Sequence, residues 1–172
     1  MAEAKPRLQA GKIRVEVVTP TGMVLSELVD EFTAPSVEGE FGVLPGHTPL
    51  LAALRVGLVT YRKGAESLAC AVGQGFVEVA DDYALLLTDR FMTKDKIDVV
   101  ATRLKLKELD EQLHAWTDEP GTPKHQEVIA EEQWEAAILT LYGDPPPPTI
   151  RGWEQYGAGK KEEEPVKTTG EN

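Results

Sequence analysis

The chain has 172 residues, of which 41% are hydrophobic, enough for one ordinary domain with an appendage or for two small domains. Its net charge of −11 argues against nucleic acids and anionic lipid surfaces as partners, because both require a basic protein surface. No apolar run reaches the roughly 20 residues that cross a bilayer, and the polar residues 1–12 predict a flexible N-terminal arm and no signal peptide.

Residues 13–90 show the alternation of apolar and polar side chains that is typical of half-buried strands, interrupted by turns. Ile13, Val15 and Val17 alternate with polar residues in the first segment. Further extended segments are predicted at 23–28, 29–33, 50–54, 57–62, 68–72, 76–79 and 83–88. Short strands at this spacing predict an antiparallel β-sandwich or flattened barrel as the first domain.

The segment 38–51, with the sequence EGEFGVLPGHTPLL, concentrates glycines, prolines, two carboxylates and a histidine. Glycine permits a positive φ and proline holds φ near −65°, so the segment is predicted to be a rigid, shaped loop. A rigid loop loses little entropy when it binds, which favours the presentation of Glu38, Glu40 and His47 to a partner.

After Asp89 the spacing of apolar residues changes to that of amphipathic helices. Thr93 is predicted to cap a first helix, and a second helix is predicted over 125–142. The expected apolar faces are Ile97, Val100, Ala101, Leu104, Leu109, Leu113 and Trp116 in the first helix, and Ala130, Trp134, Ala137, Ile138 and Leu141 in the second. The short linker between the helices predicts an antiparallel helical hairpin over residues 91–143.

Residues 144–172 form a tail that begins with four prolines at 145–148 and later carries a charged run. Such a composition predicts a disordered, solvated segment with little packed structure. Trp153 and Tyr156 are the exception, because two aromatic side chains in a polar segment are candidates to dock on the folded part of the chain.

No residue pattern supports a metal site or a cofactor. The three histidines, His47, His114 and His125, show no ligand spacing. Cys70 is the only cysteine, so no intrachain disulfide can form and a reducing compartment fits the chain. Because Cys70 lies in an apolar strand segment, it is expected to be a buried structural thiol.

Catalytic and nucleotide-binding hypotheses also concern the glycine-containing segments. If the chain were a small enzyme, Glu38, Glu40 and His47 would be its acid–base residues. The plainer interpretation is that Glu38 and Glu40 are carboxylates that face solvent on the surface. Residues 39–47 have the glycines of a phosphate loop but no lysine and no following helix. The Gly-Gln-Gly at 73–75 lacks the third glycine of a dinucleotide fingerprint and predicts a tight bend between strands.

The chain resembles the epsilon subunit of F-type, proton-translocating ATP synthases over about residues 13–110. The matching segments follow the family's order: VTPTG at 18–22, EGEFGVLPGHTPLL at 38–51, GQGFVEV at 73–79, LLTD at 86–89 and ID at 97–98. Each segment is weak alone, while their order and spacing together are specific. In that family a β-sandwich precedes a two-helix hairpin, and the subunit sits at the foot of the central rotor stalk without doing chemistry.

The resemblance implies that the sandwich binds the gamma subunit and the membrane-embedded ring of c subunits, coupling proton flow to ATP synthesis. It also implies a peripheral location on the cytoplasmic face of a bacterial inner membrane. Glu40 takes the position of the loop carboxylate that faces the c ring, and Glu38, Phe41 and His47 complete the candidate partner-binding set. For His47 two interpretations remain open, a partner contact and a hydrogen bond that holds its own loop.

The helical hairpin departs from the family in two ways. Bacterial members that bind ATP there carry Ile-Asp-x-x-Arg-Ala. Here Ile97 and Asp98 match the first two positions, but Ala101 stands where the motif has arginine, and arginine occurs only at Arg103. The nucleotide-binding set Ile97, Asp98 and Arg103 is therefore incomplete, and ATP sensing is not expected.

The second departure is the charge of the last helix, which is a candidate regulatory element that contacts the alpha and beta subunits. Inhibitory members carry basic residues there, whereas this helix carries Glu127, Glu131, Glu132 and Glu135. Like charges repel, so inhibition of ATP hydrolysis by the hairpin is not expected. The alternative to a synthase subunit is a free-standing β-sandwich binding module, which predicts that no other synthase subunit co-purifies.

Overall fold

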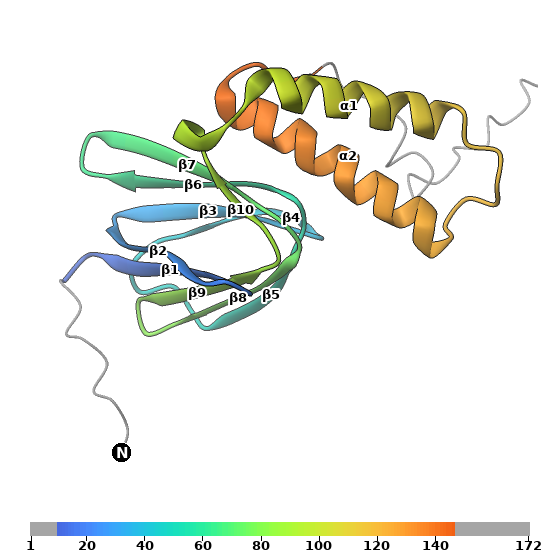
Figure 1. Ribbon diagram of the computed structural model, residues 1–172. Helices are drawn as coiled ribbons and strands as arrows, with labels where there is room; N and C mark the ends of the chain where they lie inside the picture. Colours follow the sequence, from blue (N-terminus) through green and yellow to red (C-terminus); the bar gives the residue numbers. More distant parts are fainter. Residues whose placement is uncertain (1–9, 147–172) are drawn as a thin grey trace, which may run out of the picture.

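The computed structural model describes residues 10–146, which form ten β-strands followed by two α-helices (Figure 1). The strands are β1 (Ile13–Thr19), β2 (Gly22–Val29), β3 (Glu31–Ser36), β4 (Gly39–Val43), β5 (Leu50–Leu54), β6 (Gly57–Lys63), β7 (Glu66–Val72), β8 (Gly75–Ala80), β9 (Tyr83–Thr88) and β10 (Phe91–Thr93). A short 3₁₀ turn, η1 (Lys94–Lys96), leads into α1 (Val99–His114), and α2 (Pro123–Tyr142) follows.

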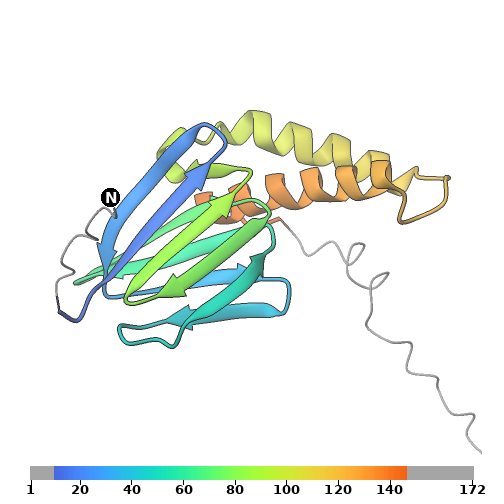
Figure 2. The ribbon, with the colours of Figure 1, turned by 90° about the horizontal axis from the view of Figure 1, so that it is seen from below.

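The strands belong to one sheet that folds into two layers. Their order is β10-β7-β6-β3-β5-β8-β9-β1-β2, with β4 paired to β3, and β1 and β9 form the parallel pair. β3 and β5 share only the Ser36–Leu54 rung, so the sheet passes there from one layer to the other. Between β2 and β3 the chain passes from one layer to the other, and there the backbone N–H of Asp30 donates to the carbonyl of Arg62 in β6 at 2.8 Å. This arrangement confirms the predicted β-sandwich or flattened barrel (Figure 2).

The alternation of residues along the strands places one face of each layer in a common core. Ile13, Val15 and Val17 of β1 are completely buried in the same cluster as Phe32 of β3. Burial of each such side chain stabilises the fold by about 1.5–3 kcal/mol. Cys70 lies in this core, as predicted, and burial raises the pKa of its thiol to about 12.

Two strands differ from the prediction. β4 lies inside the segment expected to be a loop, and it pairs with β3 from the Phe32–Val43 rung to the Ser36–Gly39 rung. Glycines lower the strand propensity of β4, so pairing with β3 decides its conformation more than local sequence does. β10 pairs with β7 and extends the sheet beyond residue 90, where the sandwich was expected to end.

The start of α1 also differs from the prediction. Thr93 precedes η1 and makes no side-chain capping bond. Asp98 is the N-cap of α1, and its carboxylate accepts a hydrogen bond from the backbone N–H of Ala101 at 3.1 Å. The 3₁₀ turn therefore takes up the residues that the sequence assigned to the first turn of the helix.

The predicted apolar face of α1 is only partly buried. Ile97, Leu109, Leu113 and Trp116 are half-buried, but Val100, Ala101 and Leu104 are exposed. Val100 and Leu104 are 77% and 59% exposed, whereas Thr102 and Leu106 are the buried residues of this helix. Apolar residues occur all round α1, so periodicity alone selects no face, and α1 buries the side that contacts α2.

α2 is buried on two sides and lies between α1 and the sandwich (Figures 1 and 2). Trp134, Ile138 and Leu141 pack with residues of the sandwich such as Ala71, which confirms the predicted apolar face. Leu139 lies on the side of α1.

Four charged residues, which we call the hairpin clamp, join the sandwich to both helices. Arg90 follows β9 and forms an ion pair with Glu131 of α2, and its guanidinium lies 5.8 Å from the ring centroid of Trp134. The ammonium of Lys105 on α1 lies 2.9 Å from the Glu131 carboxylate and 2.8 Å from that of Glu135. Because the Glu135 side chain is buried, this cation compensates a charge that water cannot solvate.

The clamp shifts the ionisation of Glu131, Lys105 and Arg90 toward their charged forms. The hydrogen bond from Arg90 is the main reason that the pKa of Glu131 is lowered. The pKa of Lys105 is raised, first by its hydrogen bond to Glu135. The pKa of Arg90 is also raised, first by its hydrogen bond to Glu131.

We expect Lys105→Met to lower the free energy of unfolding at pH 7 by about 1–3 kcal/mol, because it leaves the buried Glu135 carboxylate without its cation. Urea unfolding measures this change. Lys107→Met removes an exposed cation from the same helix and is the matched control. Equal effects of the two substitutions would contradict the clamp.

We expect Glu131→Gln to flatten the pH dependence of stability. The folded pKa of Glu131 lies below its ordinary value of 4.5, so its ion pairs stabilise the fold above that value and are lost as the pH falls through the lowered pKa. Unfolding free energies between about pH 6 and pH 3 should then fall less in the variant than in the wild type. Glu127→Gln, at an exposed position on α2, should keep the wild-type slope.

Candidate functional site

The segment 38–51 contains two turns on either side of β4, so its polar residues lie at opposite ends of this strand. Glu38 lies in the β3–β4 turn and Glu40 at the start of β4, whereas His47 lies in the turn that leads to β5. β4 has five residues, which at roughly 3.3 Å per residue span about 16 Å. The structure does not bring Glu38 and Glu40 together with His47.

The β3–β4 turn is held by Ser36. Its hydroxyl donates to the carbonyl of Gly39 at 2.7 Å and accepts from the backbone N–H of Glu38 at 3.2 Å. Gly39 has a φ of 124°, which favours glycine. The turn exposes Glu38, while Glu40 lines a groove of about 470 Å³ between α2 and strands β3 and β6.

The β4–β5 turn is held by one hydrogen bond to a neighbouring connection and by one within the turn. The backbone N–H of Gly46 donates to the Asp82 carboxylate at 2.5 Å, which ties the turn to the β8–β9 connection. Nδ1 of His47 lies 2.6 Å from the carbonyl oxygen of Thr48 and donates to it when protonated. This contact favours the interpretation in which His47 holds its own loop.

The arrangement gives no acid–base site in this segment. A general base and a general acid must both reach the reacting group at hydrogen-bond distance, and His47 is a strand length away from Glu38 and Glu40. Phe41 is half-buried and packs against the sandwich core, so it supports β4 from inside. Among the four candidate partner-binding residues, the two carboxylates are the exposed ones.

A row of apolar side chains crosses the outer face of β5, β8, β9, β1 and β2. The strand register pairs Ala53 with Phe76 and Phe76 with Leu87. It also pairs Leu87 with Val18 and Val18 with Met23. Residues that face each other across neighbouring strands point to the same side of the sheet. We call these five residues the outer stripe.

The outer stripe is open to solvent. Phe76, Leu87 and Met23 are 58%, 47% and 57% exposed, and the exposed Leu51 lies on the same face, two residues before Ala53. Singly exposed apolar residues are common on proteins, but a contiguous group of large ones marks an interaction surface. The outer stripe is therefore the main candidate site for a protein partner.

The sequence of β9 contains a signal for the outer stripe. β9 reads YALLLT, in which Ala84 and Leu86 are buried and Leu87 points outward. A strand that is apolar on both faces is typical of a sheet covered on both sides. β8 is also apolar on both faces at this point, because the exposed Phe76 precedes the buried Val77.

The glycines at 73 and 75 serve backbone packing, as predicted. A Cβ atom on Gly75 would lie 1.8 Å from the carbonyl oxygen of Leu87, and one on Gly73 would lie 1.9 Å from the Asp89 carboxylate. A side chain at position 75 would push β8 away from β9, next to the outer stripe, and one at position 73 would displace the Asp89 side chain.

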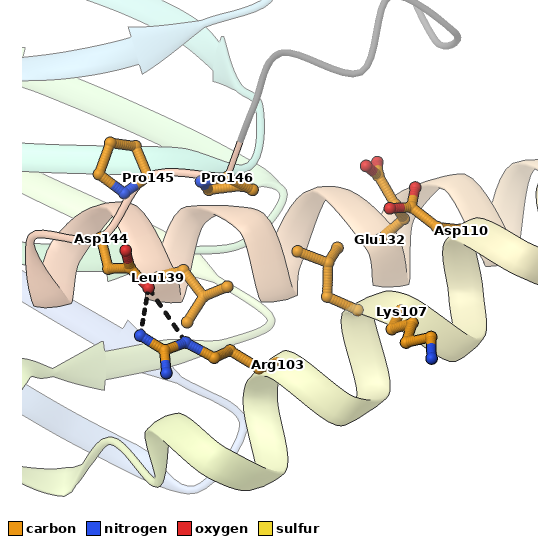
Figure 3. Close-up of a pocket in the computed structure, with 9 residues that line it drawn as sticks. Arg103, Lys107, Asp110, Glu132, Leu139, Asp144, Pro145 and Pro146 are labelled. Atoms are coloured by element: carbon orange, nitrogen blue, oxygen red, sulfur yellow. Dashed lines mark hydrogen bonds and ion pairs between the residues drawn. The ribbon is translucent and has the colours of Figure 1, made fainter.

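The three residues of the incomplete nucleotide-binding pattern have structural partners. Ile97 is half-buried and packs on the cluster between α2 and the sandwich, and Asp98 caps α1. Arg103 donates to the Asp144 carboxylate from Nε at 3.0 Å and from Nη2 at 2.6 Å (Figure 3). A phosphate at Arg103 would have to compete with this carboxylate.

The acidic residues of α2 are not all directed to solvent. Glu131 and Glu135 belong to the hairpin clamp, and Glu132 is buried. The expected repulsion of an acidic partner therefore rests mainly on Glu127, which is exposed.

Residues 10–146 contain no group of three or more histidine, cysteine, aspartate or glutamate side chains arranged to hold a metal ion. Over the same residues, neither helix combines the length and the apolar character that a membrane span requires.

Comparison with known proteins places the sandwich in a family. Residues 12–94 match the family model described as ATP synthase, Delta/Epsilon chain, beta-sandwich domain. The ATP synthase epsilon chain 2 of Syntrophotalea carbinolica is 47% identical over 108 residues, covering 63% of this chain and 78% of that protein. The ATP synthase epsilon chain of Geobacter metallireducens is 39% identical over 122 residues, covering 71% of this chain and 88% of that protein.

A solved structure supports the fold. A chain of the Euglena gracilis mitochondrial ATP synthase, in the cryo-EM structure of OSCP/F1/c-ring in rotational state 1, superposes with a TM-score of 0.65 at 18% identity. The match covers 81% of this chain and 86% of that chain. The resemblance inferred from the ordered sequence segments is confirmed by the curated relatives, and the chain belongs to the family of ATP synthase epsilon chains, non-catalytic subunits of that complex.

Proposed function

We propose that the chain works in the central rotor stalk of a proton-translocating ATP synthase, where it binds the gamma subunit and the c ring. In this role it couples proton flow to ATP synthesis without doing chemistry itself, at the cytoplasmic face of a bacterial inner membrane. The outer stripe carries the proposal, because it is an open apolar surface on a member of this family.

The outer stripe suits the gamma subunit, since a permanent contact within a complex buries apolar surface. α2 covers the other layer, at β6 and β7, so the docked hairpin leaves the stripe open. The stripe lies on strands fixed by the core, and a rigid surface loses little entropy when it binds.

The β3–β4 turn suits a polar contact with the c ring. Glu38 and Glu40 are exposed carboxylates, and the Ser36 hydrogen bonds fix the turn that carries Glu38. A charge-assisted hydrogen bond to such a carboxylate is stronger than a neutral one and remains possible at a wet junction.

Docking of the helical hairpin on the sandwich through the clamp supports a role without inhibition of ATP hydrolysis. Its carboxylates Glu131 and Glu135 are used within the chain. We expect removal of residues 118–172 to raise ATP hydrolysis by the assembled enzyme little or not at all. A several-fold rise would show that the hairpin inhibits.

The test of the stripe is affinity purification of the tagged chain from its native membranes in mild detergent. The wild type should recover gamma, the catalytic subunits and the c ring. Phe76→Asp should lower that recovery roughly tenfold or more, because burial of an unpaired carboxylate costs more than the about 1.4 kcal/mol that a tenfold change represents.

Leu68→Asp is the matched control, because Leu68 is exposed on β7 in the other layer. Circular dichroism should show that both variants fold. Recovery of the wild-type chain alone, from membranes with an intact synthase, would overturn the proposal and favour a free-standing binding module.

The turn is tested by charge reversal. Glu38→Lys together with Glu40→Lys should leave gamma recovery unchanged but lower the ratio of ATP-driven proton pumping to ATP hydrolysis in membranes. Glu66→Lys, at an exposed position at the start of β7, is the control. An unchanged ratio of proton pumping to ATP hydrolysis would show that neither carboxylate takes part in the coupling contact.

A further inference from the structure

A second row of outward-facing residues runs beside the outer stripe. The strand register pairs Leu51 with Glu78 and Glu78 with Leu85. It also pairs Leu85 with Glu16 and Glu16 with Ser26. On β5, β8, β9 and β1 each of these residues lies two positions from a member of the outer stripe, so both rows point to the same side of the sheet. We call these residues the second row.

The carboxylate of Glu16 is used within the chain. The hydroxyl of Tyr83 donates to it at 2.6 Å, and the hydroxyl of Ser26 donates to it at 3.2 Å. The guanidinium of Arg14 donates to the Ser26 oxygen at 3.1 Å and so joins the same network. Burial and the hydrogen bond to Glu16 raise the pKa of Tyr83 to about 12, so this phenol is neutral. The charges of Arg14 and Glu16 therefore offset each other within the network.

Glu78 is the charged residue of the second row that this network leaves without a cation. Its side chain is exposed, and within residues 10–146 its carboxylate forms no hydrogen bond or ion pair. Its neighbours on the outer face are apolar, namely Leu51 and Leu85 on the adjacent strands and Phe76 and Ala80 along β8. A carboxylate surrounded by apolar side chains is solvated only while this face is open to water.

A partner that covers the outer stripe also covers Glu78. Residues two positions apart on a strand are separated by about 6.6 Å, whereas a helix with its side chains is about 10–12 Å wide. Docking on Phe76 and Leu87 therefore removes the Glu78 carboxylate from water. Burial of a carboxylate is unfavourable unless an opposite charge accompanies it.

We propose that the gamma subunit presents a lysine or an arginine to Glu78 where it covers the outer stripe, and that this ion pair determines which partner the face accepts. The ion pair rests on the proposed function, in which gamma occupies this face. An apolar surface alone accepts many apolar partners, whereas a carboxylate within it disfavours every partner that lacks a cation at that position. Glu78 is thus a specificity-determining residue, while the outer stripe supplies the contact area.

Replacement of Glu78 by an uncharged residue tests the proposal, because binding changes in opposite directions with and without the cation. With a cation opposite Glu78, Glu78→Leu leaves that cation buried and unpaired. Without one, Glu78→Leu enlarges the apolar face and removes the cost of burying the carboxylate. Glu78→Gln makes the same distinction with a polar side chain of nearly unchanged size, so the test does not depend on how a leucine packs.

The measured quantity is the rate at which gamma is lost from the tagged full-length chain, after the complex from native membranes is immobilised in mild detergent and washed. We expect Glu78→Leu and Glu78→Gln each to raise this rate at least about tenfold. Glu66→Leu, at an exposed position on β7 in the other layer, should leave the rate unchanged. Circular dichroism should show that the variants fold. An unchanged or lower rate in either Glu78 variant would overturn the proposal.

Phe76→Asp in the same experiment separates the ion pair from the assignment of this face to gamma. If Phe76→Asp releases gamma no faster than the wild type does, the outer stripe is not the gamma site, and both the assignment and the ion pair are overturned. If Phe76→Asp speeds the release and the Glu78 variants do not, gamma binds the stripe without a cation at Glu78, and only the ion pair is overturned.

Discussion

The burial of α2 on two sides is the constraint on which the C-terminal half of this protein depends. Trp134, Ile138 and Leu141 pack on the sandwich, while Leu139 faces α1. A helix covered on both sides cannot keep all of its carboxylates in water. Glu135 is buried as a result, and a buried charge requires a nearby opposite charge.

The required cations come from outside α2. Arg90 follows the last long strand of the sandwich, and Lys105 lies on α1, so the clamp joins three parts of the chain that are distant in sequence. The ion pairs hold the orientation of the hairpin, while apolar burial supplies most of its attachment. An acidic helix therefore packs stably within an acidic chain of net charge −11.

The position of α2 also determines which surface of the sandwich is open. Because α2 occupies β6 and β7, the outer face of the other layer keeps its apolar row exposed. The chain thus has two apolar faces on its sheet, one covered by its own helix and one open to solvent. Gly75 allows β8 to approach β9 closely beneath that second face.

The sequence by itself determined the class of fold and the family. Period-2 alternation identified the strands, as in Ile13–Val17, and the ordered segments from 18 to 98 identified the resemblance that the curated relatives confirm. The face of α2 that carries Trp134 was also readable, because its apolar residues recur at helical spacing. Such local regularities need no knowledge of the rest of the chain.

Only the tertiary structure decided the rest, because it depends on contacts between distant residues. β4 is a strand since β3 pairs with it, although its glycines read as a loop. Leu104 is exposed since α1 turns Leu106 toward α2. The sequence can show that β9 is apolar on both faces, but the register of five strands decides which residues join Leu87 in the outer stripe. The clamp depends on the docking of α2, and no spacing in the sequence reveals it.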